Sequence, residues 1–466
     1  MSTRETLCLA PGVSLSLAAE GRRLVTSREQ VMLPPVSAGV GAALEALASG
    51  EHGLDELTGL AGQEGLTHAA LFHTLLEGLR TRVGLARALR LESTVIATLS
   101  PAAPRASGPG PREGVRYGLS RFVFTHAVDG ALVLENPASD GRLWMKTWHG
   151  PALLGALATP RHPEDFRAAV PGIPAEAAAA FLRMLMEMGA LTELNAEGAP
   201  VEPEALMTWE FHDLLFHRQT RWGLREGIYG GATYRFKDKL PQPGKKPPPP
   251  SEPVALHVPD LPALRQEDVP FTEVLERRRS LRKHGSRPVT RAQLGELLYR
   301  AVGQRHVVFP GRGEGEGRPF PSGGAIYETE VYLIVHQCEG LEQGLYYYRP
   351  DDHALYRVAG RSPDLDLLLH AAMPGARLET PPQVMLVLTA RFARVAWKYQ
   401  TMAYAVMLKH VGVVMQTLYL VATAMGLAPC GLGGGSAELF ARASGLDPLV
   451  EGSIGELFLG SAPDES

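Results

Sequence analysis

The stretch Val384–Gly412, VMLVLTARFARVAWKYQTMAYAVMLKHVG, contains both kinds of element that a layered domain requires. It begins with the continuous apolar run VMLVLTA, which predicts a buried strand. From Tyr399 to Gly426 apolar residues occupy nearly all sides of a helical pattern, and such a helix is normally buried in a core or in an oligomer interface. Between the two elements stand Lys398 and Tyr399, an amine beside a phenol.

Helix and strand patterns alternate around this stretch from Val254 onward. Helical patterns cover Pro270–Gly285, Thr290–Gly303 and Pro363–Met373, and strand patterns cover Glu328–Cys338, Gly344–Gly360 (a hairpin turning at Pro350–Asp352), Pro382–Phe392 and Gly452–Gly460. This mixture predicts an α+β domain in which helices wrap a central mixed sheet.

A proline-rich segment, Leu240–Pro253 (LPQPGKKPPPPSEP), separates this domain from the front half of the chain. Consecutive prolines fix φ and remove amide donors, so we expect an extended, semi-rigid spacer. The sequence therefore predicts four parts, which are residues 1–110, 111–200, a connecting helix and linker at 201–253, and the final domain at 254–466.

Two similar arrangements of strands and helices precede the spacer. In the first, two short strands around Ala19–Gly21 are followed by helical patterns at Ser37–Gly50, Gly53–Gly62 and Thr67–Leu91. In the second, strands turn at Asp129–Gly130 and Asp140–Gly141, and helical patterns follow at Gly150–Pro160, His162–Val170 and Pro174–Leu194. Strand pairs with three short helices predict winged-helix-like modules, and two plain packing domains are the alternative.

The composition excludes several classes of protein. The formal net charge of −4 over 466 residues provides no basic field for nucleic acid. The widely spaced Cys8, Cys338 and Cys430 form no zinc pattern and indicate reduced thiols. The first residues lack a signal-peptide pattern, and no stretch is expected to be long and apolar enough to span a bilayer. We therefore expect a cytoplasmic protein that binds neither nucleic acid nor membrane.

No metal site is expected. His212 and His217 lie in one helical pattern, but their spacing of five does not stack two ligands on one helix face, and no cysteine or carboxylate completes a set. Packing, or a lid over the next domain, explains them better.

Three segments of the last domain carry residues suited to holding an anionic or planar ligand. The basic run RRRSLRK contains Arg278, Arg279, Ser280 and Arg282, whose guanidinium and hydroxyl groups suit phosphate oxygens, although a solvated basic surface is the alternative. Two loops bring glycines whose backbone can approach a ligand closely, although a tight turn is the alternative for the first. They contain Pro321, Ser322, Gly323 and Gly324 in the first, and Gly431, Leu432, Gly433 and Gly434 in the second.

The second loop has neither the glycine order of a dinucleotide fold nor the lysine of a P-loop. Its neighbour Cys430 is better explained as a packed small residue than as a nucleophile, because no histidine partner is evident.

These motifs, in this order, resemble those of the SagB-type dehydrogenases, the thiazole- and oxazole-forming branch of the nitroreductase fold. The resemblance runs through RRRSLRKHG, PSGGAIYETEVYLIV, GLYYYRPDDHAL, WKYQTMAYAVMLKHVGVV and GSIGELFLG, and covers Val254–Gly460. The length and layout also resemble cyanobactin-type azoline oxidases, which place winged-helix-like peptide-binding domains before the flavin domain.

The resemblance implies FMN bound at a homodimer interface. It assigns the flavin phosphate and ribityl chain to Arg278–Arg282, and it places the isoalloxazine along the Pro321–Gly324 loop, with the Gly431–Gly434 loop at its border. It implicates Lys398 and Tyr399 in catalysis. Relatives carry proline where this chain has Glu328, which leaves the shape of the first loop open.

Converting an azoline into an azole removes two electrons and two protons, and the hydride must go to the flavin because no side chain can accept it. A base must take the proton. A desolvated pocket beside a flavin favours the neutral amine, so Lys398 is the expected base, and Tyr399 orients it, donates to the ring heteroatom or itself acts as acid or base. In the alternative, Lys398 pairs with an acidic residue and Tyr399 packs as an aromatic.

The sequence thus predicts an FMN-dependent oxidase that converts thiazolines or oxazolines of a precursor peptide into azoles. Its expected partners are that peptide, a second copy of the chain and a cyclodehydratase, and the front modules would hold the peptide by strand addition at a sheet edge. An NAD(P)H-dependent nitro or quinone reductase and a non-catalytic peptide-binding scaffold are the alternatives.

Overall fold

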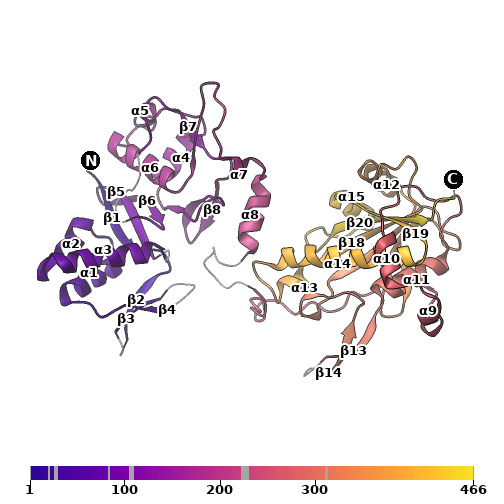
Figure 1. Ribbon diagram of the computed structural model, residues 1–466. Coiled ribbons are helices and arrows are strands. Elements are labelled where there is room, and N and C mark those ends of the chain that lie inside the picture. The colour runs from indigo at the N-terminus through magenta and orange to yellow at the C-terminus, as the bar shows by residue number, and fades with distance from the viewer. Residues whose placement is uncertain are drawn as a thin grey trace. The chain divides into compact units, whose positions relative to one another are not determined.

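The computed structural model describes residues 2–18, 21–25, 30–81, 84–103, 110–221, 230–309 and 313–464. Within these ranges the chain forms two compact units, Met1–Ile228 and Tyr229–Ser466, shown in indigo to pink and in pink to yellow (Figure 1).

The first unit is built on a six-stranded antiparallel sheet that takes strands from both predicted modules. Its order is β1 (Thr3–Leu9), β5 (Leu85–Leu91), β6 (Thr94–Ser100), β10 (Arg142–Met145), β9 (Ala131–Glu135) and β8 (Phe124–Val128). The predicted turn between β8 and β9 is present, with Asp129 and Gly130 at φ values of 47° and 75°. Both residues tolerate a positive φ, which suits the twist of a two-residue hairpin.

Two groups of helices cover separate cores in this unit. The first comprises α1 (Ala38–Ser49), α2 (Leu54–Ala61), η1 (Gly62–Glu64) and α3 (Leu66–Thr81), and the second α4 (His149–Ala156), α5 (Pro163–Phe166) and α6 (Ala175–Glu187). Smaller elements are the sheet β2 (Ser14–Ala18), β3 (Gly21–Val25) and β4 (Gln30–Met32), the pair β7 (Tyr117–Leu119) and β11 (Leu191–Glu193), and helices α7 (Glu204–Met207) and α8 (Phe211–Thr220). The winged-helix assignment of the two modules stays a prediction.

Two helix predictions in this unit were too long. The pattern Pro174–Leu194 forms helix α6 only to Glu187, and Leu191–Glu193 is strand β11. The pattern Thr67–Leu91 was expected to be helical throughout, but the helix ends at Thr81 and Leu85–Leu91 forms strand β5. This strand pairs with β1 on one side and β6 on the other, and most of it is buried. Pairing on both edges overrides the helix propensity of Leu, Ala and Arg.

The second unit contains a seven-stranded sheet. Its order is β12 (Pro253–Ala255), β17 (Ala354–Gly360), β16 (Gly344–Arg349), β15 (Thr329–Val335), β18 (Val384–Arg391), β20 (Glu451–Ser461) and β19 (Leu427–Gly431). Every neighbouring pair is antiparallel, so the α+β class is confirmed while the expected mixed sheet is corrected to an antiparallel one. A short hairpin, β13 (Arg305–Phe309) and β14 (Gly313–Gly317), lies outside this sheet.

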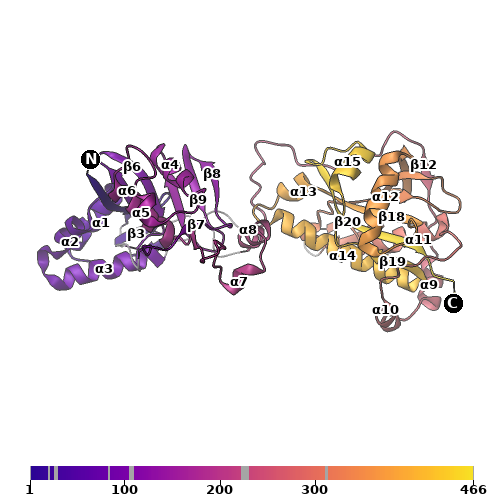
Figure 2. The same cartoon turned by 90° about the horizontal axis from the view of Figure 1, so that it is seen from above.

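Helices cover both faces of this sheet (Figures 1 and 2). Alternation along β15 sends Val331 and Leu333 to one core and Tyr332 and Ile334 to the other. The first core is closed by α11 (Arg291–Val302) and α14 (Ala403–Ala424), and the second by α12 (Pro363–Ala376) and α15 (Ala437–Ser444). Shorter helices are α9 (Leu261–Glu267), α10 (Phe271–Arg277), η2 (Gly323–Ala325) and α13 (Phe392–Ala396). The same alternation splits Tyr346 and Tyr348 from Tyr347.

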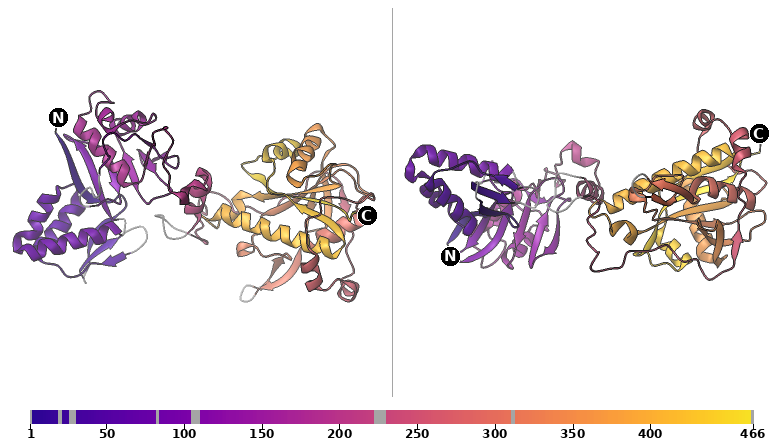
Figure 3. Two further views of the ribbon diagram at one scale, coloured as in Figure 1. Left: turned by 45° about the horizontal axis from the view of Figure 1, so that its top comes forward. Right: turned by 90° about the horizontal axis from the view of Figure 1, so that it is seen from below.

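Helix α14 runs along the sheet in both views of Figure 3. Its length and composition alone would let it cross a membrane, which the sequence analysis did not expect. However, Val411, Val414 and Leu418 pack in the first core against strands and α11. This packing explains why a helix inside a folded domain is so apolar.

The basic run is not helical beyond its start. Helix α10 ends at Arg277, and Arg278–His284 follows without helical structure, which corrects the expected helix to Gly285. Backbone pairing explains the difference, because the amide of Leu281 donates to the carbonyl of Pro429 in β19 at 3.0 Å. The basic side chains therefore lie beside the strand that leads into the second glycine loop.

Candidate active site

Lys398 and Tyr399 lie between the short helix α13 and the long helix α14. Their amides donate to the carbonyl of Val395 at 3.1 and 2.8 Å, so both residues are held against the end of α13. The expected strand-to-helix junction is corrected to a helix-to-helix one, because α13 follows β18 directly and α14 begins only at Ala403. Both side chains are half-buried.

The first glycine loop packs directly on this pair. A Cβ atom added to Gly324 would lie 2.3 Å from Nζ of Lys398, and one added to Gly323 would lie 3.2 Å from Oη of Tyr399. Gly324 also has a φ of 63°, a conformation that favours glycine. Glycine at both positions thus allows the loop to approach the amine and the phenol, and the structure brings together Ser322–Gly324, Lys398 and Tyr399.

A cleft of about 430 Å³ opens at this junction. It is lined by Gly324, Ala325, Ile326, Arg394, Trp397 and Lys398, and by Tyr234, Lys237, Gln242 and Pro243 from the segment before the domain. Burial, followed by the neighbouring Tyr234 and Glu328, raises the pKa of Tyr399. The phenol at this cleft is therefore a hydrogen-bond donor at neutral pH.

Residues 230–246 form one wall of the cleft, although the sequence analysis assigned them to a connecting helix and a spacer. Gly231 bridges Tyr399, the amide of Thr233 donates to the carbonyl of Lys398 at 3.1 Å, and indole Nε1 of Trp397 donates to the carbonyl of Leu240 at 3.3 Å. The rings of Tyr234 and Trp397 meet edge-on, 5.4 Å apart.

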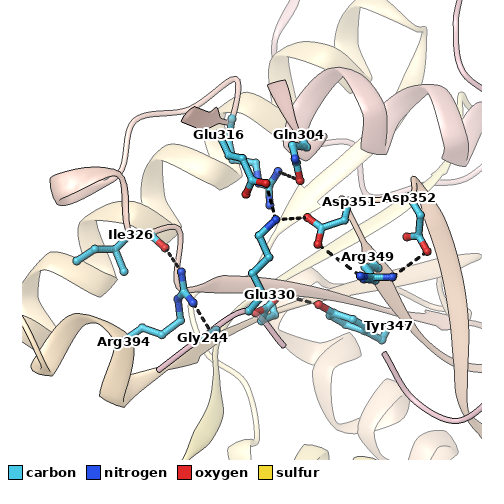
Figure 4. A network of polar contacts seen from close by, with 12 residues as sticks. Gly244, Gln304, Glu316, Ile326, Glu330, Tyr347, Arg349, Asp351, Asp352 and Arg394 are labelled. Carbon is cyan, nitrogen blue, oxygen red and sulfur yellow. Dashed lines mark hydrogen bonds and ion pairs between the residues drawn. The ribbon is translucent and has the colours of Figure 1, made fainter. Parts of the chain in front are cut away.

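Two arginines that sequence analysis left unassigned connect this wall to the glycine loop. The guanidinium of Arg394 donates to the carbonyls of Gly244 and Ile326, both at 2.6 Å (Figure 4). Arg391 also donates to the carbonyl of Gly244, at 2.8 Å. The wall and the loop are thus held by the same side chain, Arg394.

A second cleft, of about 400 Å³, shares Ala325, Ile326 and Arg394 with the first. Its charges are largely paired, as in the contacts of Lys245 with Glu316 at 2.5 Å and Asp351 at 3.2 Å (Figure 4). Below it Lys246 contacts the buried Glu451 and Tyr332. Burial, then the charge of Glu451, raises the pKa of Glu330 in the same network.

Some of the predicted phosphate-binding residues contact Tyr419, which sequence analysis missed. The hydroxyl groups of Ser280 and Tyr419 are 2.8 Å apart, the amide of Gly431 donates to the same phenol oxygen at 2.5 Å, and the guanidinium of Arg278 lies 5.6 Å from the ring centroid. Arg279 and Arg282 are exposed, and a Cβ added to Gly433 or Gly434 would meet no atom within 4 Å. Leu432 is buried.

The two clusters lie at different places along α14. Tyr419 follows His410 by nine residues, which is about 14 Å along a helix. Sequence analysis also missed His410. The only feature that could have indicated its role is that it is a polar residue on an otherwise apolar helix face. Its Nε2 accepts a hydrogen bond from the amide of Gly323 at 2.7 Å, and its Nδ1 lies 2.7 Å from Oε1 of Glu328.

The remaining candidates have structural surroundings. His212 lies 3.4 Å from Asp213, and the ring of His217 packs against Trp209. Cys430 is buried in the second core, and burial raises the pKa of its thiol, which agrees with a packed residue. In the parts of the chain that the structure describes, no group of three or more His, Cys, Asp or Glu side chains could hold a metal ion.

Comparisons with known proteins match both halves of the chain. The nitroreductase family model matches residues 275–460, and the model "Cyanobactin oxidase ThcOx" matches residues 117–226. The chain is 32% identical over 178 residues to "Putative nitroreductase MJ1384" of Methanocaldococcus jannaschii, a match that covers 38% of this chain and 83% of the relative.

Two further similarities involve the microcin B17 system of Escherichia coli. The chain is 29% identical over 154 residues to the Microcin B17-processing protein McbC, covering 32% of this chain and 56% of McbC. A solved chain of the microcin synthetase McbBCD complex with truncated pro-MccB17 bound is 21% identical, with a TM-score of 0.33, covering 58% of this chain and 86% of that chain.

The match to the Methanocaldococcus relative covers most of that relative's length, and the nitroreductase family model spans most of the second unit. The chain therefore belongs to the nitroreductase family and is an oxidoreductase.

Proposed function

We propose that this protein is an FMN-dependent azoline oxidase that converts thiazolines or oxazolines of a precursor peptide into thiazoles or oxazoles. The observation that carries the proposal is the juxtaposition of Lys398 and Tyr399 with Gly323 and Gly324, because Lys398 and Gly324 line a cleft and the other two lie directly beside them. The front segment that matches a cyanobactin oxidase, and the identity to McbC, support a peptide substrate over a small nitro compound.

The chemistry of the side chains fits FMN. Nitroreductases are typically flavin-dependent, and Arg278, Arg279, Ser280 and Arg282 supply charged and hydroxyl donors for a phosphate. Gly433 and Gly434 leave the adjoining backbone open, and the absence of side chains at Gly323 and Gly324 lets the backbone of the first loop lie close to Lys398 and Tyr399. These residues would hold the cofactor, with Pro321, Ser322, Gly431 and Leu432 beside them.

The reaction removes one hydrogen with its electron pair and one as a proton. Bound FMN supplies the two-electron acceptor that no side chain can provide. Lys398 takes the proton through its Nζ, for which the neutral amine is required. Tyr399 keeps its phenolic proton because its pKa is raised, and it donates a hydrogen bond to the ring heteroatom. The wall at residues 230–246 lines the cleft beside the amine.

The front unit would bind the precursor peptide. Its six-stranded sheet ends at β1 and β8, and β8 falls within the range matched by the cyanobactin oxidase model. An exposed strand edge can accept an extended peptide as an added strand. Binding there would raise the concentration of azolines at the cleft. We further propose a homodimer, a cyclodehydratase as the partner that supplies azolines, and a cytoplasmic location in agreement with three free cysteines.

The test is the mass of a heterocyclised peptide after incubation with the flavin-loaded protein in aerated buffer. Each ring that is oxidised should lose about 2 Da, because two hydrogens leave. An unchanged peptide mass, together with rapid anaerobic bleaching of the flavin by NADPH, would instead identify a nitro or quinone reductase. Purified protein that is colourless and takes up no added FMN would point to a peptide-binding scaffold.

A further inference from the structure

Behind the first glycine loop lies a buried pair of polar side chains, His410 and Glu328. Glu328 has an exposed fraction of 0% and His410 of 7%. Glu328 immediately precedes β15 and His410 lies within α14, so the pair joins the edge of the loop at the sheet to the long helix. We propose that His410 and Glu328 are positioning residues that hold Gly323 against Tyr399, and this inference rests on the proposed function of that cleft.

The hydrogen bonds determine the tautomer of His410. A backbone amide can only donate, so the contact from Gly323 requires an unprotonated Nε2. The proton of the neutral ring is therefore on Nδ1, and it is donated to Oε1 of Glu328. Glu328 thus fixes the tautomer that Gly323 requires, and each of these residues depends on the other.

The loop needs such support because its backbone is strained. Gly324, Ala325 and Tyr327 have φ values of 63°, 55° and 47°, and a positive φ is unfavourable for the latter two. The hydroxyl of Ser322 accepts from the amide of Tyr327 at 3.0 Å and lies 3.4 Å from Oε2 of Glu328. Glu328 therefore contacts both anchors of the loop, Ser322 directly and Gly323 through His410.

The site leaves little space for another arrangement. A Cβ added to Gly323 would lie 3.2 Å from Oη of Tyr399, 3.3 Å from Nε2 of His410 and 3.3 Å from Val406. The histidine and the phenol therefore approach the same backbone position. If His410 releases the amide of Gly323, the loop can move away from Tyr399 without breaking any other hydrogen bond of that amide.

The first experiment measures hydrogen exchange of a peptide covering residues 320–328 in the flavin-loaded protein. His410→Phe keeps a ring but removes both hydrogen bonds, and we expect exchange in this peptide to rise about tenfold. Glu328→Ala should act similarly, whereas Glu328→Gln, whose amide oxygen still accepts from Nδ1, should stay close to wild type. Gln383→Leu is the matched control, because it removes a buried amide that bonds Val289, Ser461 and Gly285. It should lower stability without a selective change at 320–328.

The second measurement is the rate of azole formation. In His410→Phe we expect kcat to fall at least tenfold while KM for the peptide stays within about twofold, with Glu328→Gln restoring the rate that Glu328→Ala loses. The proposal would be overturned if hydrogen exchange in His410→Phe equals that of the wild type, or if Glu328→Ala and Glu328→Gln exchange equally. It would also be overturned if Glu328→Gln fails to fold. If wild-type protein oxidises no azoline, the proposed function fails, and the exchange data still decide whether the pair holds the loop.

Discussion

At the scale of single residues, Lys398 and Gly324 occupy the same small space, because a side chain on Gly324 would collide with Nζ of the lysine. The amine can approach the loop this closely only because residue 324 is glycine. We predict that Lys398→Ala keeps its flavin but loses azole formation by at least about a hundredfold, since a positioned base contributes that much or more.

Lys409→Ala is the matched control for Lys398, because Lys409 is an exposed lysine on α14. It should retain the wild-type rate, and peptide mass and flavin absorbance report both properties. A flavin-loaded Lys398→Ala enzyme with full activity would remove the lysine from the mechanism.

The ionisation of Tyr399 should determine how the rate of azole formation falls at alkaline pH. Burial raises its pKa above the ordinary value of about 10, so the phenol loses its proton only as the pH rises through the higher folded-state value. If it acts as a donor, the rate due to Tyr399 should persist to about pH 10 and fall above it. Tyr399→Phe should be slower and lack this alkaline decrease. An identical alkaline decrease in Tyr399→Phe would assign that decrease to another group.

The sequence identified the residues whose chemistry is conspicuous and missed those that act through packing. Lys398, Tyr399 and the glycine loop could be selected because an adjacent amine and phenol, or adjacent glycines, are visible in one short stretch. His410 and Tyr419 could not, since their partners are 87 and 139 residues away and only the fold brings them together.

At the scale of elements, backbone pairing with distant segments determined the secondary structure wherever the local sequence pattern predicted it wrongly. Leu85–Leu91 and Arg278–His284 both have helix-forming compositions, yet the first is a strand and the second has no regular secondary structure and bonds to β19. The buried strand Val384–Arg391 and the helix Ala403–Ala424 could be predicted, because their apolar patterns are long and match their burial.

The non-helical basic segment Arg278–His284 leads to a prediction about flavin affinity. Arg279 is exposed beside Ser280, which contacts the cluster at Tyr419. We expect Arg279→Ala to weaken FMN binding by about 10- to 100-fold, the effect of losing one hydrogen bond to a charged group. Arg277→Ala, which removes an exposed arginine paired with Glu273 in α10, is the control. Fluorescence titration of the apoprotein measures both, and equal affinities would exclude a role for Arg279 in phosphate binding.

The linker also contributes a buried charge to the sheet. The side chain of Lys246 is 15% exposed and contacts Glu451, whose side chain is 5% exposed. The positive charge of Lys246 also lowers the pKa of Glu330, against the larger effect of burial. Because burial raises the pKa of Glu330, its ionisation opposes folding as the pH rises through that value. We expect Lys246→Met to lose more free energy of unfolding at pH 7 than at pH 5. Urea unfolding at both pH values, with Lys239→Met as an exposed control, measures this difference. A loss independent of pH would contradict it.

At the scale of the whole molecule, the sequence and the structure place the start of the oxidase domain at different residues. The proline pattern predicts that the oxidase domain begins at residue 254, whereas the contacts of residues 230–246 assign that segment to the same compact unit as the cleft. Residues 241–249 form neither helix nor strand, as consecutive prolines require, but proline-rich composition carries no information about what the backbone lies against.

Two truncated chains distinguish these boundaries. A chain of residues 230–466 keeps Lys246, the wall beside Tyr399 and the carbonyl of Gly244 that Arg394 binds. A chain of residues 254–466 leaves Glu451 buried without its cation, which costs about 3–5 kcal/mol, and leaves the guanidinium of Arg394 without its acceptor on the linker. We therefore expect the longer chain to unfold cooperatively with flavin bound, and the shorter chain to melt at a clearly lower temperature and lose flavin on gel filtration. Equal melting temperatures and flavin contents would show that the linker is only a spacer and that the cleft is complete without it.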